Sequence, residues 1–140
     1  MKYYISCMAY LFMAFFALPA VASENHCGEM QVRISTTPGQ HCVLTGSHLL
    51  HGNLLYGQSI PAVITEAPSS FVMHQSFFGP EVDLEYVCNQ GERFHIRTRQ
   101  DLCIMMAGNI HTQTDSPSVH VSVLQGSYFW GTHGTVTWVL

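Results

Sequence analysis

The chain of 140 residues contains little positive charge and few charged residues of either sign. Lysine and arginine together number five against nine acidic residues, and charged residues make up 10% of the chain. After Lys2 there is no lysine, and only four arginines follow: Arg33, Arg93, Arg97 and Arg99. Binding to a phosphate backbone requires a basic surface, so this composition disfavours a nucleic-acid partner. The missing lysines also exclude Schiff-base catalysis in the chain beyond Lys2.

Motifs of the common enzyme classes are missing as well: there is no GxSxG, P-loop, SxxK, HExxH or CxxC. Five acidic residues are candidates for a glycosidase-like pair of catalytic carboxyl groups: Glu66, Glu81, Asp83, Glu85 and Glu92. Three of them share one segment beside arginines, which suits surface ion pairs better than an acid with a raised pKa. We therefore predict no catalytic residue and no cofactor, and a small secreted hydrolase of unrecognised type is the alternative.

The first 22 residues have the features of a cleaved signal peptide. Lys2 precedes a long apolar run, and Ala20-Val21-Ala22 matches the A-x-A pattern of signal peptidase. Cleavage there leaves residues 23–140 as a single domain, exported to the periplasm or the extracellular space. No later run approaches the roughly 20 apolar residues of a membrane-spanning helix, so we expect no transmembrane segment in the mature chain.

Histidine is unusually frequent, with nine residues against four arginines in the mature chain. The formal charge of residues 23–140 is −5 with neutral histidines and +4 with all nine protonated. A pH-responsive binding surface is therefore a further alternative. In the motif HLLH, His48 and His51 would share a face only in a helix, but glycines interrupt this segment. We expect a strand there and predict no metal site.

Short alternating segments separated by glycine- and proline-containing turns predict an all-β fold, a compact antiparallel β-sandwich. Helical periodicity is nearly absent. The predicted strands are residues 30–36, 41–46, 48–56, 60–65, 71–77, 82–88, 93–99, 103–107, 119–125 and 135–140.

The segments 82–88 and 93–99 predict a hairpin with a defined register. Cys88 opposite Phe94, Tyr86 opposite Ile96 and Leu84 opposite Thr98 place the apolar residues on one face. The same register pairs Glu85 with Arg97 and Asp83 with Arg99 on the other face. His95 is then an outward residue without a catalytic partner.

Four cysteines remain after the leader, which carries Cys7: Cys27, Cys42, Cys88 and Cys103. An even number in a small exported domain predicts two disulfides, with three possible connectivities. The equal separations favour two local loops, 27–42 and 88–103, while a crossing such as 27–103 remains open. A catalytic cysteine–histidine pair is disfavoured because a reactive thiolate is easily oxidised outside the cell.

Two aromatic stretches are candidates for recognition. Phe77 and Phe78 lie at a predicted turn, where one ring facing the core would leave the other outward. Tyr128, Phe129 and Trp130 are consecutive between glycines, so the three rings cannot all enter one side of a strand. We predict that these five residues bind a lipid, glycan or protein surface. The alternative is that they close the ends of the core.

The runs GSHLLHGNL…GQSIPAVI, FFGPEVDLEYV and GTHGTVTWVL resemble β-sandwiches of the aegerolysin and related cytolysin type, over about half of the mature chain. This resemblance implies a two-sheet sandwich that binds membrane lipids, in some members as the targeting partner of a separate pore-forming protein. It implies a lipid-contact role for Trp130, Trp138, Phe77 and Phe78 by their aromatic character. The export signal and the four cysteines depart from that pattern.

Overall fold

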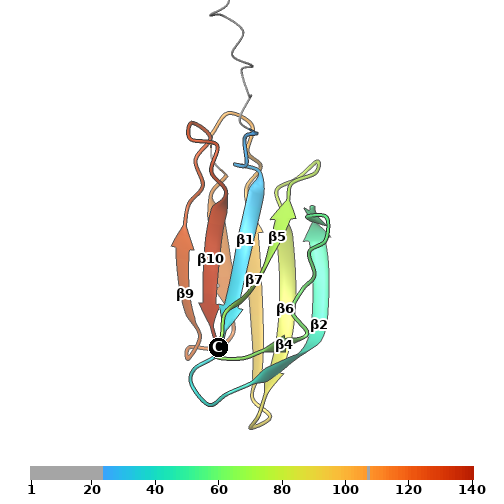
Figure 1. Cartoon of the computed structure of the whole chain (residues 1–140), viewed down its shortest axis with the longest axis vertical. Helices are drawn as coiled ribbons and strands as arrows, with labels where there is room; N and C mark the ends of the chain where they lie inside the picture. Colours follow the sequence, from blue (N-terminus) through green and yellow to red (C-terminus); the bar gives the residue numbers. More distant parts are fainter. Residues whose placement is uncertain (1–23, 107) are drawn as a thin grey trace, which may run out of the picture.

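The computed structural model describes residues 24–106 and 108–140, which form two five-stranded β-sheets packed face to face (Figure 1). The predicted all-β sandwich with two disulfides is therefore confirmed. The predicted signal peptide, residues 1–22, lies outside the described residues. Within the described ranges, no helix is long and apolar enough to cross a membrane.

The first sheet has the strand order β3-β5-β1-β10-β9. Its strands are β1 (Glu29–Ser35), β3 (Asn53–Leu54), β5 (Ser69–His74), β9 (His120–Leu124) and β10 (Gly134–Val139). The first and last strands of the domain, β1 and β10, pair in parallel at the centre of this sheet. All other neighbours are antiparallel, so the prediction of an antiparallel sandwich holds except for this pair.

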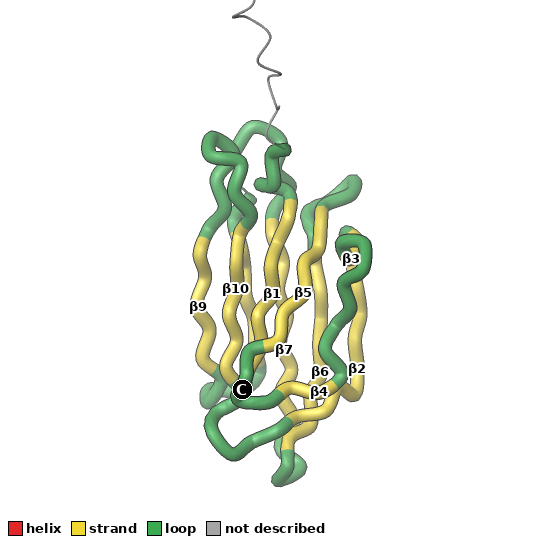
Figure 2. Tube along the Cα trace, viewed as in Figure 1, coloured by secondary structure: helices red, strands yellow, loops and turns green. Residues whose placement is uncertain are grey.

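The second sheet has the strand order β4-β2-β6-β7-β8, and all its neighbours are antiparallel. Its strands are β2 (Cys42–His51), β4 (Val63–Ile64), β6 (Glu81–Cys88), β7 (Arg93–Gln100) and β8 (Ile110–Thr114). In Figure 2 the long strands of both sheets run along the long axis of the molecule, so their connecting loops gather at its two ends.

The core forms where the alternating apolar residues of the two sheets meet, as the period of two requires. In β1 the buried apolar residues are Met30, Val32 and Ile34. Trp138 of β10 is fully buried, and its indole N–H donates to the Thr98 hydroxyl of β7 at 2.9 Å. The lipid-contact role implied for Trp138 is therefore wrong, because its ring is a central part of the core.

The β6–β7 hairpin differs by two residues from the predicted register. Tyr86 lies opposite Phe94, whereas the prediction placed it opposite Ile96. The connection is shorter than expected because Gly91, at φ +77°, allows a tight three-residue turn. A shift of two residues leaves every side chain on its predicted face, so the apolar set still faces the core.

The same shift changes the charge pairs on the outer face of the hairpin. Asp83 lies opposite Arg97 rather than Arg99, and Glu85 lies opposite His95. The imidazole of His95 also contacts the carboxylate of Asp83. The outward placement of His95 is thus correct, and it gains an acidic neighbour that the predicted register did not provide.

The disulfides join Cys27 to Cys103 and Cys42 to Cys88, so the favoured local pairing was wrong and the crossing 27–103 is present. The 15 residues from Cys27 to Cys42, and from Cys88 to Cys103, each include a complete strand. Cys27 and Cys42 therefore lie on opposite sides of β1 along the chain, and Cys88 and Cys103 on opposite sides of β7. The bridges close loops of 76 and 46 residues, each worth about 4 kcal/mol by the loop-entropy estimate.

Several strand predictions need correction. The segment that contains HLLH is a strand as expected. The predicted break at residue 47 is not present: β2 continues through it, and its register shifts lie between Leu44 and Gly46 and between Leu49 and His51. The predicted strand 103–107 is not formed by its described residues, 103–106. Strand β8 was missed because it is a polar edge strand in which only Ile110 is buried.

Candidate functional site

Four segments that are far apart in the sequence meet at one end of the sandwich. They are residues 24–28, 75–80, 101–109 without residue 107, and 125–133, and together we call them the loop end. Figure 2 shows these loops at the end where the chain enters β1. They meet because β1, β6, β8 and β10 begin there, while β5, β7 and β9 end there.

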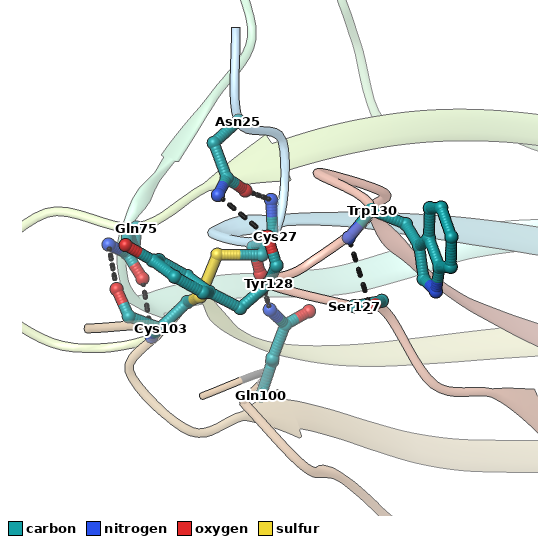
Figure 3. Close-up of a disulfide and its surroundings, with 8 residues drawn as sticks. All are labelled: Asn25, Cys27, Gln75, Gln100, Cys103, Ser127, Tyr128 and Trp130. Carbon is teal, nitrogen blue, oxygen red and sulfur yellow. Dashed lines mark hydrogen bonds between the residues drawn. A yellow bond between two sulfur atoms is a disulfide. The ribbon is translucent and has the colours of Figure 1, made fainter. Parts of the chain in front are cut away.

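The loop end is held together by the Cys27–Cys103 disulfide and the side chain of Gln75 (Figure 3). Gln75 Nε2 donates to the Cys103 carbonyl at 3.0 Å, and the Cys103 N–H donates to Gln75 Oε1 at 2.8 Å. From β7, the buried Gln100 donates its Nε2–H to the Cys27 carbonyl at 2.6 Å. These bonds connect three of the four segments to one another.

The fourth segment, between β9 and β10, is attached through Asn25. Its side-chain amide donates to the Tyr128 carbonyl at 3.0 Å, and the His26 N–H donates to the Gly131 carbonyl at 2.9 Å. A cavity of about 380 Å³ beside the disulfide is lined by Asn25, Tyr128 and Glu29, among others. Tyr128 lies along this disulfide in Figure 3 and is only partly exposed.

The tip of the β9–β10 loop presents two aromatic rings to solvent. Ser127 and Thr132 exchange two backbone hydrogen bonds of 3.0 Å, which closes a four-residue turn. Gly131 takes φ +61° in this turn, a conformation that a residue with a Cβ rarely adopts. Phe129 and Trp130 at the tip are 93% and 84% exposed. The Trp130 side chain points away from the disulfide (Figure 3).

The β5–β6 loop exposes two further rings. The prediction expected one of Phe77 and Phe78 to face the core, but both are exposed, Phe77 at 92%. Phe78 lies against the imidazole of His51, with the ring centroids 4.9 Å apart. Neither phenylalanine closes the core, because both rings are exposed to solvent.

Sequence reasoning missed three exposed apolar residues at the loop end: Ile104, Met105 and Met106. They were assigned to a strand that the structure does not contain. A short continuous apolar run is also typical of a buried strand, so no local pattern distinguished this loop from a strand.

Together these residues form a surface that we call the apolar crown. It comprises Phe77, Phe78, Ile104, Met105, Met106, Phe129 and Trp130. Seven large apolar side chains from three loops at one end of a small domain exceed the scattered exposure that is normal for soluble proteins. The disulfide and the hydrogen bonds beneath them hold the loops in place.

One pair of titratable side chains, His26 and Glu29, lies at the loop end near the crown. The His26 Nδ1–H donates a hydrogen bond to the Glu29 carboxylate at 3.0 Å, three residues along the chain. This hydrogen bond and the negative charge of Glu29 raise the pKa of His26 above its ordinary value of 6.5. Both groups are solvent-accessible, so the pair provides a local pH response at the rim of the loop end.

Three of the five acidic residues considered for catalysis take part in ion pairs on the outer face of the second sheet. Glu81 accepts the Nε–H of Arg97 at 2.8 Å, Glu85 pairs with Arg93 at 3.3 Å, and Asp83 contacts His95. Among the described residues, no three or more His, Cys, Asp or Glu side chains gather in a group that could hold a metal ion.

Comparison with known proteins finds a shared fold and no sequence family. No protein-family model and no curated protein sequence matches the chain. Among solved structures, the lipid-binding protein Nakanori is similar with a TM-score of 0.61 and 10% identity, over 80% of this chain and 70% of Nakanori. RahU matches with a TM-score of 0.54 and 8% identity, over 81% of this chain and 96% of RahU. IP-1A from Alcaligenes faecalis matches with a TM-score of 0.53 and 12% identity, over 83% of this chain and 93% of IP-1A.

These likenesses support the predicted resemblance at the level of the fold. At 8–12% identity they establish the sandwich architecture and carry no residue-by-residue correspondence. Function must be argued from the loop end itself.

Proposed function

We propose that this protein is a secreted module that binds lipid membranes by placing the apolar crown in the interfacial layer. The observation that carries the proposal is the gathering of seven exposed apolar side chains on one braced end of the sandwich. Lipid binding by Nakanori, which has a similar fold, agrees with this choice of surface. The two disulfides suit an oxidising compartment, as expected for an exported protein.

The magnitude of the apolar contribution fits reversible binding. Full burial of one large apolar side chain is worth about 1.5–3 kcal/mol, so half-burial of four of them contributes about 3–6 kcal/mol. Such values are typical of proteins that associate with a membrane surface without spanning it. Aromatic rings, as in Phe129 and Trp130, favour the boundary between headgroups and acyl chains.

Charge contributes little to this mode of binding. Polybasic surfaces bind anionic lipids at about 1 kcal/mol for each lysine or arginine near the membrane. All four arginines that follow Lys2 lie in β1 or β7, and none lies in the crown. We therefore expect binding that depends weakly on anionic lipid and on salt.

The proposal is tested by co-sedimentation of the oxidised, secreted protein with vesicles of phosphatidylcholine, sphingomyelin and cholesterol. Trp130→Ala should lower the bound fraction severalfold because it removes the largest ring of the crown. Tyr56→Ala is the matched control, since Tyr56 is a fully exposed aromatic outside the loop end. Equal binding by both variants, or no binding of the wild type to any of these vesicles, contradicts the proposal. A glycan or protein surface would then be the remaining target of the crown.

A further inference from the structure

A second feature, which adjoins the apolar crown at Phe78, lies on the outer face of the second sheet. Two adjoining cavities of about 270 and 240 Å³ share Glu81 and Arg99 in their walls. The larger one continues along β7 and β8 to His111 and Gln113, and the smaller one extends to Phe78 in the β5–β6 loop. We call the two cavities together the outer groove.

The charges in the outer groove compensate one another. Arg97 donates from Nε to the carboxylate of Glu81 at 2.8 Å, and Glu81 is almost fully buried. Arg99 lies 3.6 Å from the carboxylate of Asp101, and His111 Nε2 lies 2.9 Å from the other oxygen of the same carboxylate. Two cations face two anions here, so the groove has little net charge with which to attract an ion.

The same residues present hydrogen-bond donors and acceptors side by side. Each guanidinium has five N–H donors, and the contacts described above use only some of those in Arg97 and Arg99. Asp101 supplies acceptor positions, and Gln113 supplies both kinds of group. Because Arg97 lines the larger cavity and is held by its bonds to Glu81, a ligand there would use its remaining donors at little entropic cost.

An aromatic ring lines part of the groove. Phe78 lines the smaller cavity and is held against the imidazole of His51. A ring face beside a row of mixed donors and acceptors suits a ligand with an apolar C–H face and several hydroxyl groups.

We propose that the outer groove binds a neutral saccharide. The hydroxyl groups of a sugar donate and accept at once, which matches the paired cations and carboxylates, and its C–H face matches Phe78. An anion would have to displace Asp101 from Arg99 and His111. An apolar ligand would remove water from the half-exposed Arg99 and Asp101 without replacing its hydrogen bonds. This site goes beyond the lipid contact of the crown and does not depend on it. Because Phe78 belongs to both surfaces, a glycan on the same membrane lies within reach of the groove.

The test measures binding of the oxidised protein to an array of neutral, sialylated and sulfated oligosaccharides, followed by titration of the strongest neutral ligand in solution. Arg99→Ala and His111→Ala remove groups that face the groove and are about half exposed. Each should weaken binding at least about tenfold, as expected for the loss of hydrogen bonds from a charged or ring donor. Arg93→Ala is the matched control: Arg93 lies on the same strand and face, at the other end of β7, and should change affinity less than twofold.

Retention of vesicle binding by Arg99→Ala would show that the two sites are separate. The proposal is overturned if the protein binds vesicles but no neutral saccharide. It is also overturned if both groove variants, Arg99→Ala and His111→Ala, keep the wild-type affinity for the saccharide. A preference for sialylated or sulfated ligands that fades with salt also overturns it, because the groove would then be an anion site.

Discussion

Gln75 and Cys103 are joined by two hydrogen bonds, one in each direction, between the Gln75 side chain and the Cys103 backbone. This pair ties the β5–β6 loop to the β7–β8 loop beside the Cys27–Cys103 disulfide. The two loops carry five of the seven residues of the apolar crown. The positions of these apolar side chains therefore depend on polar contacts beneath them.

Replacing Gln75 by alanine should loosen the crown. The variant loses both hydrogen bonds and leaves the Cys103 N–H and carbonyl without their partner, at a cost of about 1–3 kcal/mol. We expect a lower urea midpoint and faster hydrogen exchange at residues 101–106, with the exchange of β1 amides little changed. Uniform loss of protection throughout the sandwich would show that Gln75 supports the whole fold rather than the loops.

Both disulfides should stabilise the fold, but each should hold a different end of the molecule in place. The pair Cys27→Ser and Cys103→Ser releases the loop end, whereas the pair Cys42→Ser and Cys88→Ser releases β2 from β6 at the opposite end. Each double variant should lose about 4 kcal/mol of stability, measured by chemical denaturation. Only the first should also reduce vesicle binding in the folded population, and an equal reduction by both would contradict the role assigned to the loop end. Peptide mapping under non-reducing conditions checks the connectivity itself.

Substitution of the two tryptophans should affect the stability of the fold to very different extents. Trp138→Ala removes a fully buried ring and its bond to Thr98, so the free energy of unfolding should fall by about 3–5 kcal/mol. Trp130→Ala changes an exposed ring and should alter stability by less than about 0.5 kcal/mol. Thermal or urea unfolding measures both, and comparable losses would mean that Trp130 belongs to the core.

His26 should titrate above its ordinary range. Because the folded pKa exceeds the unfolded value of 6.5, the stabilisation from the pair with Glu29 is present below about pH 6.5 and is lost as the pH rises through the raised pKa. Proton NMR of the imidazole in wild type and in Glu29→Gln measures this directly. We expect a lower pKa for His26 in the variant, and an unchanged value would contradict the contact at 3.0 Å.

The sequence allowed the sandwich, most strands and the facing of their side chains to be predicted, since all follow from local alternation. Long-range pairing was less accessible. The equal spacing of the cysteines suggested local loops, but a complete strand such as β1 separates Cys27 from Cys42. The register of the hairpin depended on the backbone conformation of Gly91, which alternation does not report.

The candidate site was predicted in part for the same reason. Consecutive aromatics such as Phe129 and Trp130 cannot all face a core, so the sequence indicated that at least one ring is exposed but did not identify which. Ile104, Met105 and Met106 look like a buried strand until the chain path shows that they follow the end of β7. The outer groove combines residues from four strands and two loops, which no local pattern brings together.

The most direct test of membrane contact by the crown uses the chain's own fluorescence. The chain contains two tryptophans, of which Trp138 is fully buried and Trp130 is exposed. Adding vesicles of phosphatidylcholine, sphingomyelin and cholesterol should shift the emission to shorter wavelength, and brominated lipids should quench the shifted component. Trp130→Phe should abolish both effects while keeping the buried signal of Trp138. Binding to vesicles without any shift or quenching in the wild type would place the contact elsewhere and contradict the account.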